Sequence, residues 1–452
     1  MQLSTKLTFV DFDSQALPIM CLTPAEFQTW ILEQDEETQN WVARMGVVGK
    51  AGDVLVSSSE VIAIVEHALA HFAAIPEKLK GGTYYFEGLE ENLLEVAVLA
   101  WGMATYRYQE FKTGAPVPKL VWPEDIDRGA FQALIESITF VRDMINQPAN
   151  LMNPQTLAQK SEDLAKSWGA EIEILKDQDR LQKEYPLVHA VGKASATPPC
   201  LIDVRWGNPA HPKLTLIGKG VTFDSGGLDL KSSSNMLLMK KDMGGAAHVL
   251  ALAHLIIHHK LPVRLRVLIP AVENAVSGTA IRPGDIFKSR KGLTVEIGNT
   301  DAEGRLILAD ALAEADSENP DLVIDFATLT GAARIAVGTE IGALFSNQKD
   351  LLWPLQELGD QLEDPLWPLP LWSGYESMIA SKFADVNNVG TSSYAGATLA
   401  ALFMKKFIEA PWIHIDMMAW NITAKPGKPE GGEAMGLRTI FAYLMSRYSV
   451  LN

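Results

Sequence analysis

Two short segments of the sequence concentrate ionisable residues and glycines. They are GKGVTFDSGGLDLK at Gly218–Lys231, continued by KKDMGGAA at Lys240–Ala247, and NTDAEGRL at Asn299–Leu306. If the last segment is extended, Asp301, Glu303 and Arg305 point to one side, because alternate side chains of an extended chain share a face. In a helix Glu303 would leave that face. We therefore predict an extended segment that presents two carboxylates and a guanidinium together.

The first segment adds acidic and basic side chains after a neighbouring predicted strand. They are Lys219, Asp224, Lys231 and Asp242. Asp224, Asp242, Asp301 and Glu303 are four carboxylates without a compensating cluster of arginines, so they would repel one another unless cations lay between them. Hard oxygen ligands suit Mg, Mn or Zn, and two ions about 3.5 to 4 Å apart are a common arrangement for hydrolysing peptides or phosphate esters. The pattern predicts a dinuclear metal site with a bridging carboxylate.

Each of these residues also has an ordinary structural interpretation. Asp242 could cap a helix, Asp224 could be a turn aspartate, and Lys219 could be a surface lysine. The run FDSGG at Phe223–Gly227 could carry a nucleophilic serine, but it lacks the glycine before it and the proline after it that a chymotrypsin-like loop has. The joint occurrence of the carboxylates favours the metal site over these separate interpretations.

The elements that must position these side chains alternate between strands and helices from about residue 171 onward. Short β-branched and apolar runs predict strands at Glu171–Leu175, Leu201–Trp206, Lys213–Ile217, Val263–Ile269, Val295–Ile297, Leu322–Phe326 and Trp412–Ile415. Apolar helices are predicted at Met243–His259 and Leu306–Asp316. This alternation predicts an α/β fold with a mainly parallel, twisted sheet flanked by helices. Ligands of such sheets lie at the carboxyl ends of strands, where both segments fall.

Residues 1–125 are predicted to form a smaller N-terminal α/β domain, followed by a linker helix at 126–150 and a catalytic dinuclear-metal domain at 151–452. In the first domain we expect strands at Lys6–Asp11 and Thr83–Phe86 and helices at Pro24–Met45 and Asn92–Tyr108. Prolines and a glycine in Gly114–Asp125 break both periodicities and predict a linker. Arg128–Asn146 is predicted to be one long helix, ended by Pro148.

The composition bounds the compartment and the partners. The chain has 55 Asp plus Glu against 39 Lys plus Arg, and its formal net charge of −16 argues against a nucleic-acid-binding role. Cys21 and Cys200 are its two cysteines, and they predict neither a disulfide framework nor a thiolate metal site. The N-terminus lacks the features of a secretory signal, and the apolar run Val249–Ile257 is about half of the ~20 residues that a membrane-spanning helix needs. We expect a cytoplasmic protein without a membrane segment.

These motifs resemble those of the leucyl aminopeptidase, or cytosol aminopeptidase, family, and among its branches the bacterial peptidase B-like enzymes. NTDAEGRL, GKGVTFDSGG and KKDMGGAA carry the resemblance at their separations in this sequence. It extends through RDMINQPANLMNP at Arg142–Pro154, ATLTGA at Ala327–Ala332 and WIHIDMMAW at Trp412–Trp420. The sequence departs from the common family pattern at Ser232 and at Ser392–Phe403. These departures bear on substrate preference and leave the metal site intact.

The resemblance implies a metal-dependent aminopeptidase that hydrolyses the N-terminal peptide bond of short peptides with a free N-terminus. Two divalent ions, Mn or Zn, would be held by Lys219, Asp224, Asp242, Asp301 and Glu303, with Asp224 and Glu303 bridging. A lysine can be a ligand only as a neutral amine, so the cations must depress a pKa that is about 10.4 when unperturbed. A water or hydroxide between the ions would attack the scissile carbonyl.

The same resemblance implies catalytic and substrate-binding roles. Lys231 would stabilise the tetrahedral intermediate, and Arg305 would hold a bicarbonate ion that relays the proton. Met239, Thr328 and Gly331 would line the pocket for the first side chain and favour leucine or other hydrophobic residues. The family also implies a homohexamer.

Two other functions draw on the same features. Members of the family are hexameric and some bind DNA, so a hexameric structural or DNA-binding regulatory protein is an alternative. The acidic composition and the intact ligand set argue against it. A metal-dependent phosphoesterase could use the same carboxylates, but phosphate sites usually add histidines and arginines, and His248 is the only histidine beside these segments.

Overall fold

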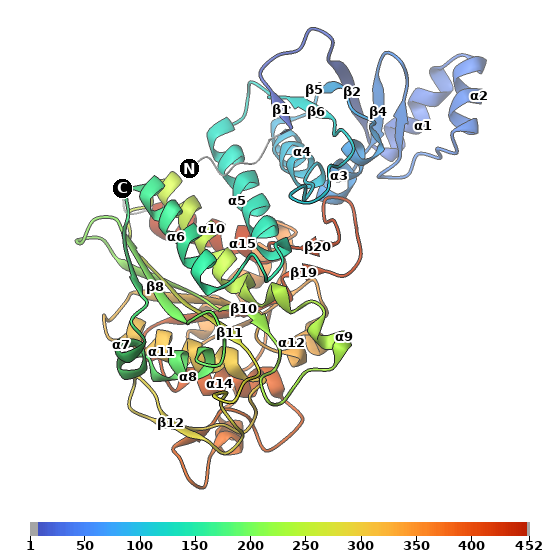
Figure 1. The fold of residues 1–452 in the computed structure, drawn as a ribbon. Helices are drawn as coiled ribbons and strands as arrows, with labels where there is room; N and C mark the ends of the chain where they lie inside the picture. The colour runs from blue at the N-terminus through green and yellow to red at the C-terminus, as the bar shows by residue number, and fades with distance from the viewer. Residues whose placement is uncertain (1–7, 450–452) are drawn as a thin grey trace. The chain divides into compact units, whose positions relative to one another are not determined.

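The computed structural model of the protein describes residues 8–449, which divide into two compact units (Figure 1). The smaller unit comprises residues 8–139 together with Asn421–Glu430, and the larger comprises Phe140–Trp420 together with residues 431–449. The predicted helix Arg128–Asn146 is helix α5 and contains the boundary between them. Within the described residues, no helix has both the length and the apolar character needed to cross a membrane.

The smaller unit is built on a six-stranded sheet with the order β1-β6-β5-β2-β4-β3. Its strands are β1 (Phe9–Val10), β2 (Leu17–Leu22), β3 (Val54–Val56), β4 (Val61–Ile64), β5 (Thr83–Glu87) and β6 (Lys119–Val121). Its helices are α1 (Pro24–Glu33), α2 (Glu36–Arg44), α3 (Leu69–Lys78) and α4 (Glu91–Ala104). Neighbouring strands are parallel except β3 and β4, which are antiparallel.

Two predictions for the smaller unit are wrong in part. The predicted linker Gly114–Asp125 contains β6, which pairs with β1 and β5, because its prolines flank the strand and leave the strand N–H groups free to bond. The predicted helix Pro24–Met45 is two helices. A new helix begins after Asp35, whose carboxylate accepts a hydrogen bond from the backbone N–H of Thr38 at 2.8 Å. Of the predicted strand Lys6–Asp11, residues 6 and 7 lie outside the described residues.

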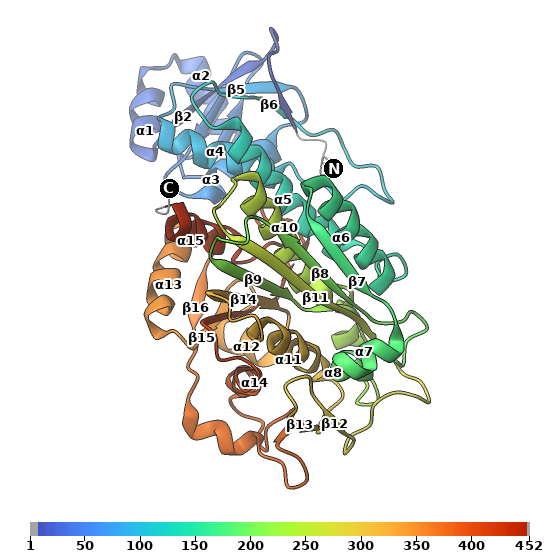
Figure 2. The same ribbon diagram turned by 90° about the vertical axis from the view of Figure 1, so that its left-hand side faces the viewer.

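The larger unit is built on a nine-stranded sheet with the order β16-β15-β18-β14-β9-β11-β8-β7, in which β10 also pairs with β11. Its strands are β7 (Glu171–Leu175), β8 (Cys200–Trp206), β9 (Lys213–Gly218), β10 (Gly220–Asp224), β11 (Arg264–Asn274), β14 (Leu322–Ala327), β15 (Gly342–Ser346), β16 (Leu366–Pro368) and β18 (Trp412–Asp416). The central pairs β18–β14, β14–β9 and β9–β11 are parallel, whereas β11–β8, β8–β7 and β15–β18 are antiparallel. The predicted α/β fold with a mainly parallel sheet is confirmed, and Figure 2 shows its central strands side by side.

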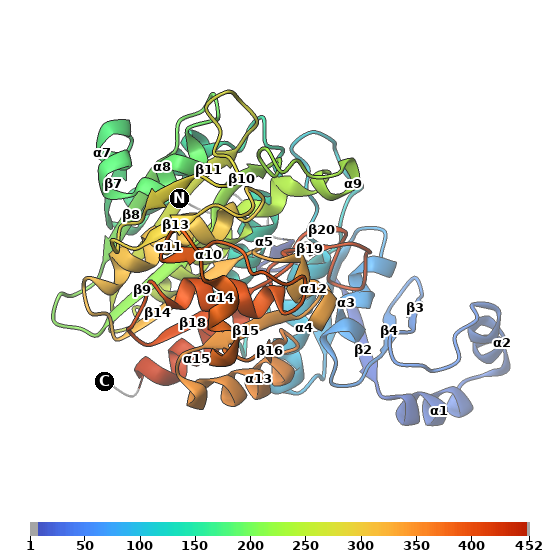
Figure 3. The ribbon, with the colours of Figure 1, turned by 90° about the horizontal axis from the view of Figure 1, so that it is seen from below.

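Helices cover both faces of this sheet (Figure 1). Helices α6 (Pro154–Trp168), α10 (Gly244–His258) and α15 (Leu437–Ser449) lie on one face, and α8 (Pro186–Gly192), α11 (Glu303–Asp316) and α14 (Gly396–Lys405) lie on the other. Figure 3 shows α11 beside α14. A single buried core joins Val323 of the sheet to Leu312 and Phe403 of these two helices. The remaining helices are α7 (Gln178–Glu184), α9 (Ser233–Met236), α12 (Gly331–Val337) and α13 (Leu352–Gln361).

A separate three-stranded sheet consists of β12 (Ile286–Lys288), β13 (Thr294–Glu296) and β17 (Val386–Asn387). The predicted strand Val295–Ile297 therefore belongs to this sheet and not to the main one. Strands β13 and β17 pair in parallel, which brings the chain just before Asn299 beside the chain just before Asn388. Two further strands, β19 (Trp420–Asn421) and β20 (Gly431–Gly432), are short, as are the 3-10 helices η1 (Met239–Met243), η2 (Lys349–Leu351) and η3 (Ser373–Ile379).

Candidate metal centre and active site

Four elements bring predicted metal ligands to the carboxyl ends of parallel strands. Lys219 lies between β9 and β10, Asp224 is the last residue of β10, Asp242 lies in η1, and Glu303 is the first residue of α11. The chain that follows η1 approaches the sheet closely because it contains Gly245. A Cβ atom there would lie 2.0 Å from the carbonyl oxygen of Phe326, so only glycine fits this approach.

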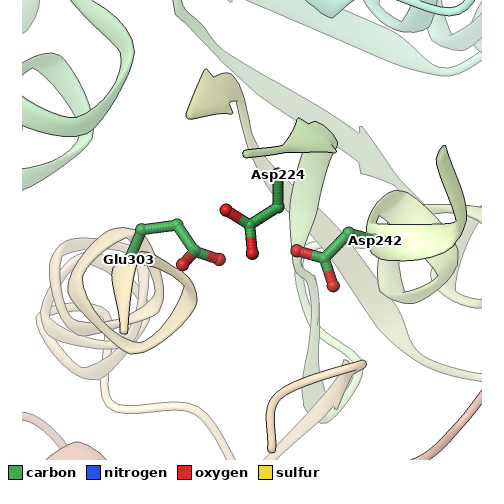
Figure 4. A group of neighbouring side chains, drawn as sticks. All are labelled: Asp224, Asp242 and Glu303. Atoms are coloured by element: carbon green, nitrogen blue, oxygen red, sulfur yellow. The ribbon is translucent and has the colours of Figure 1, made fainter. Parts of the chain in front are cut away.

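Asp224, Asp242 and Glu303 form a buried carboxylate cluster (Figure 4). Each offers one carboxylate oxygen, and these atoms all lie within 4.8 Å of one another. All three residues are almost fully buried, with exposed fractions of 2%, 2% and 1%. Asp301, the other predicted acidic ligand, is not part of this group, and its side chain is 33% exposed. The structure therefore brings together three of the four predicted carboxylates directly.

Two lysines contact these carboxylates. Lys219 Nζ lies 2.8 Å from Asp242 Oδ2 and 3.0 Å from Glu303 Oε1. Lys231 Nζ lies 2.8 Å from Asp224 Oδ2 and also forms an ion pair with Asp301, which joins that residue to the cluster. These two contacts are made by lysines, and Arg305, the nearby arginine of the motif, bonds elsewhere. Two ammonium groups stand against four carboxylates, so negative charge remains in excess.

The pKa values of the cluster reflect this excess. Burial, followed by repulsion from Asp224, raises the pKa of Glu303 to about 8 and that of Asp301 to about 6. Burial alone would lower the pKa of Lys219, but the surrounding carboxylates, Asp242 and Glu303 first, outweigh it and raise that pKa. A divalent cation at this position would remove the repulsion that raises the carboxyl pKa values.

The oxygen atoms of the cluster retain capacity for a metal ion. Glu303 Oε2 is buried and has no hydrogen-bond donor among the described residues. Asp242 Oδ2 and Asp301 Oδ1 also lack a hydrogen bond of good geometry, although each lies close to a lysine nitrogen. Buried acceptors without donors are costly in a folded protein. The donor set of hard oxygens and one amine fits divalent Mn or Zn.

The segment Asn299–Leu306 is not extended, and that prediction is wrong. It forms a turn, in which Asn299 Oδ1 accepts a hydrogen bond from the backbone N–H of Asp301 at 2.6 Å, and α11 begins at Glu303. Glu303 and Arg305 then leave the first helical turn in different directions. Glu303 meets Lys219, while Arg305 Nη1 donates to the carbonyl oxygen of Asn388 at 2.8 Å. Burial lowers the pKa of Arg305 to about 10.

Asn274, which sequence reasoning missed, holds the two ligand-bearing loops together. It ends β11 and is 2% exposed. Its Nδ2 donates to Asp224 Oδ1 at 2.8 Å and to the carbonyl oxygen of Thr300 at 3.1 Å. The Thr300 hydroxyl in turn donates to the carbonyl oxygen of Gly226 at 2.6 Å. The sequence signal that could have identified Asn274 is its position, because it is a polar residue at the end of an otherwise apolar strand.

The predicted pocket residues lie at the ends of three elements. Met239 begins η1, Thr328 follows β14, and Gly331 begins α12. Thr328 is buried, and its hydroxyl donates to Asp242 Oδ1 at 2.6 Å. Met239 is half-buried and Gly331 is exposed. A Cβ atom on Gly331 would lie 3.8 Å from Arg334 Nη2, which places that guanidinium beside this glycine.

A mainly parallel α/β sheet that carries a buried carboxylate cluster at its strand ends has the arrangement that a metal-dependent hydrolase requires. The chain belongs to the cytosol aminopeptidase family. Residues 139–441 match the model of the cytosol aminopeptidase family catalytic domain, and residues 17–123 match that of the M17 aminopeptidase N-terminal domain. The family resemblance inferred from the sequence is confirmed, and the protein is a metal-dependent aminopeptidase.

Curated relatives and solved structures agree with this assignment. The chain is 41% identical over 372 residues to a probable cytosol aminopeptidase of Syntrophotalea carbinolica, covering 77% of this chain and 74% of the relative. It is 35% identical over 415 residues to probable cytosol aminopeptidase 1 of Shewanella oneidensis, covering 89% and 82%. The crystal structure of a cytosol aminopeptidase from Coxiella burnetii matches with a TM-score of 0.92 and 43% identity over 98% of this chain and 99% of that chain.

A further solved structure is a metal complex. The bottromycin maturation enzyme BotP in complex with Mn matches with a TM-score of 0.86 and 28% identity, covering 96% of this chain and 100% of that chain. Together with the family assignment and the carboxylate cluster, this similarity supports a divalent metal cofactor for the protein.

Proposed function

We propose that the protein removes the first residue of short peptides that carry a free N-terminus and that it uses two divalent ions, Mn or Zn, to do so. The observation that carries this proposal is the buried cluster of Asp224, Asp242 and Glu303, whose ligand atoms lie within 4.8 Å of one another. The carboxylates of this cluster repel one another, and Glu303 Oε2 is a buried acceptor without a donor. A pair of cations would offset the repulsion and give that oxygen a partner.

The ligands divide between the two ions in this proposal. One ion would be held by Lys219, Asp224, Asp242 and Glu303. The other would be held by Asp224, Asp301 and Glu303, with the backbone carbonyl of Asp301 as a further ligand, so both ions would share Asp224 and Glu303. Lys219 is already within 3.0 Å of two of its fellow ligands. Its amine must lose a proton to become a ligand.

The bound ions would supply an activated water nucleophile and a Lewis acid for the scissile carbonyl. Lys231 lies at the exposed edge of the cluster, with its side chain 13% exposed, where it can donate to the oxyanion that develops on the substrate. Arg305 would bind a bicarbonate ion as a proton relay. Its Nε atom is buried without a hydrogen-bond partner among the described residues, which leaves a donor for such an anion.

Met239, Thr328 and Gly331 form the proposed pocket for the first side chain. A methionine and a glycine beside the site suit leucine or another hydrophobic residue. Because the Thr328 hydroxyl already donates its proton to Asp242, it has none left to donate to a polar side chain of the substrate.

A second specificity, for acidic first residues, is favoured by two unpaired cations near the same pocket. Lys241 Nζ and Arg334 Nη1 are buried and have no hydrogen-bond partner among the described residues. Arg334 lies beside Gly331 and is near enough to Lys241 to help lower the pKa of that lysine to about 7, after burial, which is the larger cause. An anion would give both groups a partner, and a side-chain carboxylate of the substrate would supply one.

The assembly and the cellular setting are further parts of the proposal. We propose a homohexamer in the cytoplasm, within the bacterial peptidase B-like branch of the family, with an N-terminal domain at 1–125, a linker helix at 126–150 and a catalytic domain at 151–452. The family assignment supports the hexamer, and sedimentation of the full chain would test it.

The experiment is hydrolysis of leucine p-nitroanilide by metal-stripped protein to which Mn or Zn is returned. We expect activity that requires metal, is lost in Glu303→Ala and is absent with an N-acetylated substrate, because the free amine is part of recognition. Glutamate p-nitroanilide, compared in wild type and Arg334→Met, decides between the two specificities. A folded, metal-loaded protein that cleaves no aminoacyl substrate in a wider panel would refute the proposal and favour the structural or DNA-binding alternative.

A further inference from the structure

Asn388 uses every hydrogen-bonding position of its side chain on one short segment, Gly298–Ala302. Its Oδ1 accepts from the backbone N–H groups of Gly298 at 2.8 Å and Asn299 at 3.3 Å. Its Nδ2 donates to the carbonyl oxygens of Asn299 at 2.8 Å and Ala302 at 3.3 Å. An asparagine amide offers two lone pairs and two N–H groups, so all of them are used. Asn388 is fully buried, with an exposed fraction of 0%.

The backbone of Asn388 is fixed from two sides as well. Its N–H donates to the carbonyl oxygen of Glu296 at 3.0 Å, which continues the parallel pairing of β13 and β17. Its carbonyl oxygen accepts from Arg305 Nη1 at 2.8 Å. The position of the amide is therefore set by a sheet and not by a free loop.

The segment Gly298–Ala302, to which the Asn388 side chain is hydrogen-bonded, contains or adjoins the acidic residues of the site. It contains Asp301 and ends one residue before Glu303. The segment is a turn and not part of a sheet or helix, so its backbone groups depend on side chains for their bonds. Removing the amide would leave N–H and carbonyl groups of this partly buried turn without their partners, and the turn would relax to find other partners.

We propose that Asn388 is a positioning residue that sets the metal affinity of the site by fixing the turn that presents Asp301 and Glu303. It also holds Arg305 through its own carbonyl oxygen, so one residue orients both the ligand turn and the arginine. This inference rests on the proposed metal site. Groups that orient metal ligands typically contribute about 10- to 100-fold to metal affinity or activity.

The test is a calorimetric titration of metal-stripped, full-length protein with Mn²⁺. In Asn388→Ala we expect the dissociation constant for Mn²⁺ to rise about 10- to 100-fold. Asn388→Ser, which keeps one donor and one acceptor, should show a smaller rise. The matched control is Asn387→Ala, because the neighbouring Asn387 is only half-buried and its Oδ1 accepts one local bond, from the N–H of Val389 at 3.0 Å. This control should bind Mn²⁺ as wild type does.

The melting temperature of each metal-free protein separates positioning from general structure. A purely structural Asn388 would lower that temperature and leave Mn²⁺ affinity unchanged in the folded protein, and this result would overturn the inference. If Asn388→Ala does not fold, Asn388→Ser is titrated in its place and read in the same way. Wild-type protein that binds no Mn²⁺ would instead overturn the metal site itself, so the two failures are distinguishable.

Discussion

The hydroxyl of Thr328 lies 2.6 Å from Asp242 Oδ1 and 3.2 Å from the backbone carbonyl oxygen of the same residue. Both residues are buried, with exposed fractions of 3% and 2%, so the bond to the carboxylate is made away from water and holds it in one orientation. Thr328, which the family resemblance assigns to the proposed substrate pocket, therefore also orients a proposed metal ligand.

Thr328→Val tests this second role because valine keeps the shape and removes the donor. Without the hydroxyl, Asp242 Oδ1 loses its hydrogen bond, and we expect the Mn²⁺ concentration needed for half-maximal activity to rise about 10-fold. Thr328→Ser, which keeps the hydroxyl, should behave like wild type. A change confined to the KM for leucine p-nitroanilide, with an unaltered Mn²⁺ requirement, would show that Thr328 only lines the pocket.

Much of the fold is encoded in local patterns and could be predicted. The run LVIDFA at Leu322–Ala327 is buried at every position, as a central parallel strand requires. The helix Gly244–His258 is buried at every position from Gly244 to Ala253, and these residues are mostly apolar because the sheet and other helices cover them. Such patterns do not state which strand lies beside which, and Val295–Ile297 was assigned to the wrong sheet for that reason.

The candidate site was predictable in its residue types and not in its geometry. Spacing alone did not distinguish an extended Asp301–Arg305 segment from a turn that enters a helix at Glu303. The two residues that hold the ligand loops, Asn274 and Asn388, lie outside the charged motifs. Asn388 is 89 residues from its partner Asn299, and no local pattern reports a contact at that separation.

Lys219→Arg should abolish the metal site although it conserves charge. Lys219 is 2% exposed, and a Cβ atom on Gly304 would lie 2.5 Å from its Cε, so the surrounding space is full. An arginine would be overpacked there, and its guanidinium has no lone pair to give because it stays protonated. We expect at least a 100-fold loss of Mn²⁺-dependent kcat/KM, measured on protein whose circular dichroism shows a folded chain. Near-wild-type activity in Lys219→Arg would mean that Lys219 is only a counterion.

Gly331→Ala should change substrate preference and leave stability unaltered. The nearest atom to an added Cβ is Arg334 Nη2 at 3.8 Å, an ordinary van der Waals distance. The melting temperature should therefore stay near that of wild type. If Gly331 borders the pocket, the added methyl group should lower kcat/KM for leucine p-nitroanilide about 10-fold and affect alanine p-nitroanilide much less. Equal effects on both substrates would exclude Gly331 from the pocket.

His248 should make the stability of the protein depend on pH. The ring is fully buried, with Nδ1 2.7 Å from the carbonyl oxygen of Gly244 and Nε2 accepting from the N–H of Met435 at 2.9 Å. The neutral tautomer with the proton on Nδ1 satisfies both bonds, and a second proton would break the Met435 bond. Burial lowers the pKa of His248 to about 4, against the opposing influence of Asp364 and Glu433.

The sign of the effect follows from the lowered pKa. In the unfolded chain His248 binds a proton near pH 6.5, whereas in the folded chain it does not do so until about pH 4. The contribution of His248 to stability is therefore full above pH 6.5 and falls as the pH drops towards 4. From pH 7 to pH 5 the stabilising contribution of His248 should fall by about 2 kcal/mol, measured by urea unfolding as the difference between wild type and His248→Gln, because buried carboxyls such as Glu303 and Asp310, whose pKa values are raised, act in the opposite direction in both proteins. His254, whose pKa burial also lowers to about 4, adds to the loss. The glutamine of His248→Gln cannot titrate, so between pH 7 and pH 5 the variant should lose about 2 kcal/mol less stability than wild type. An equal pH dependence of stability in the two proteins would contradict the lowered pKa of His248.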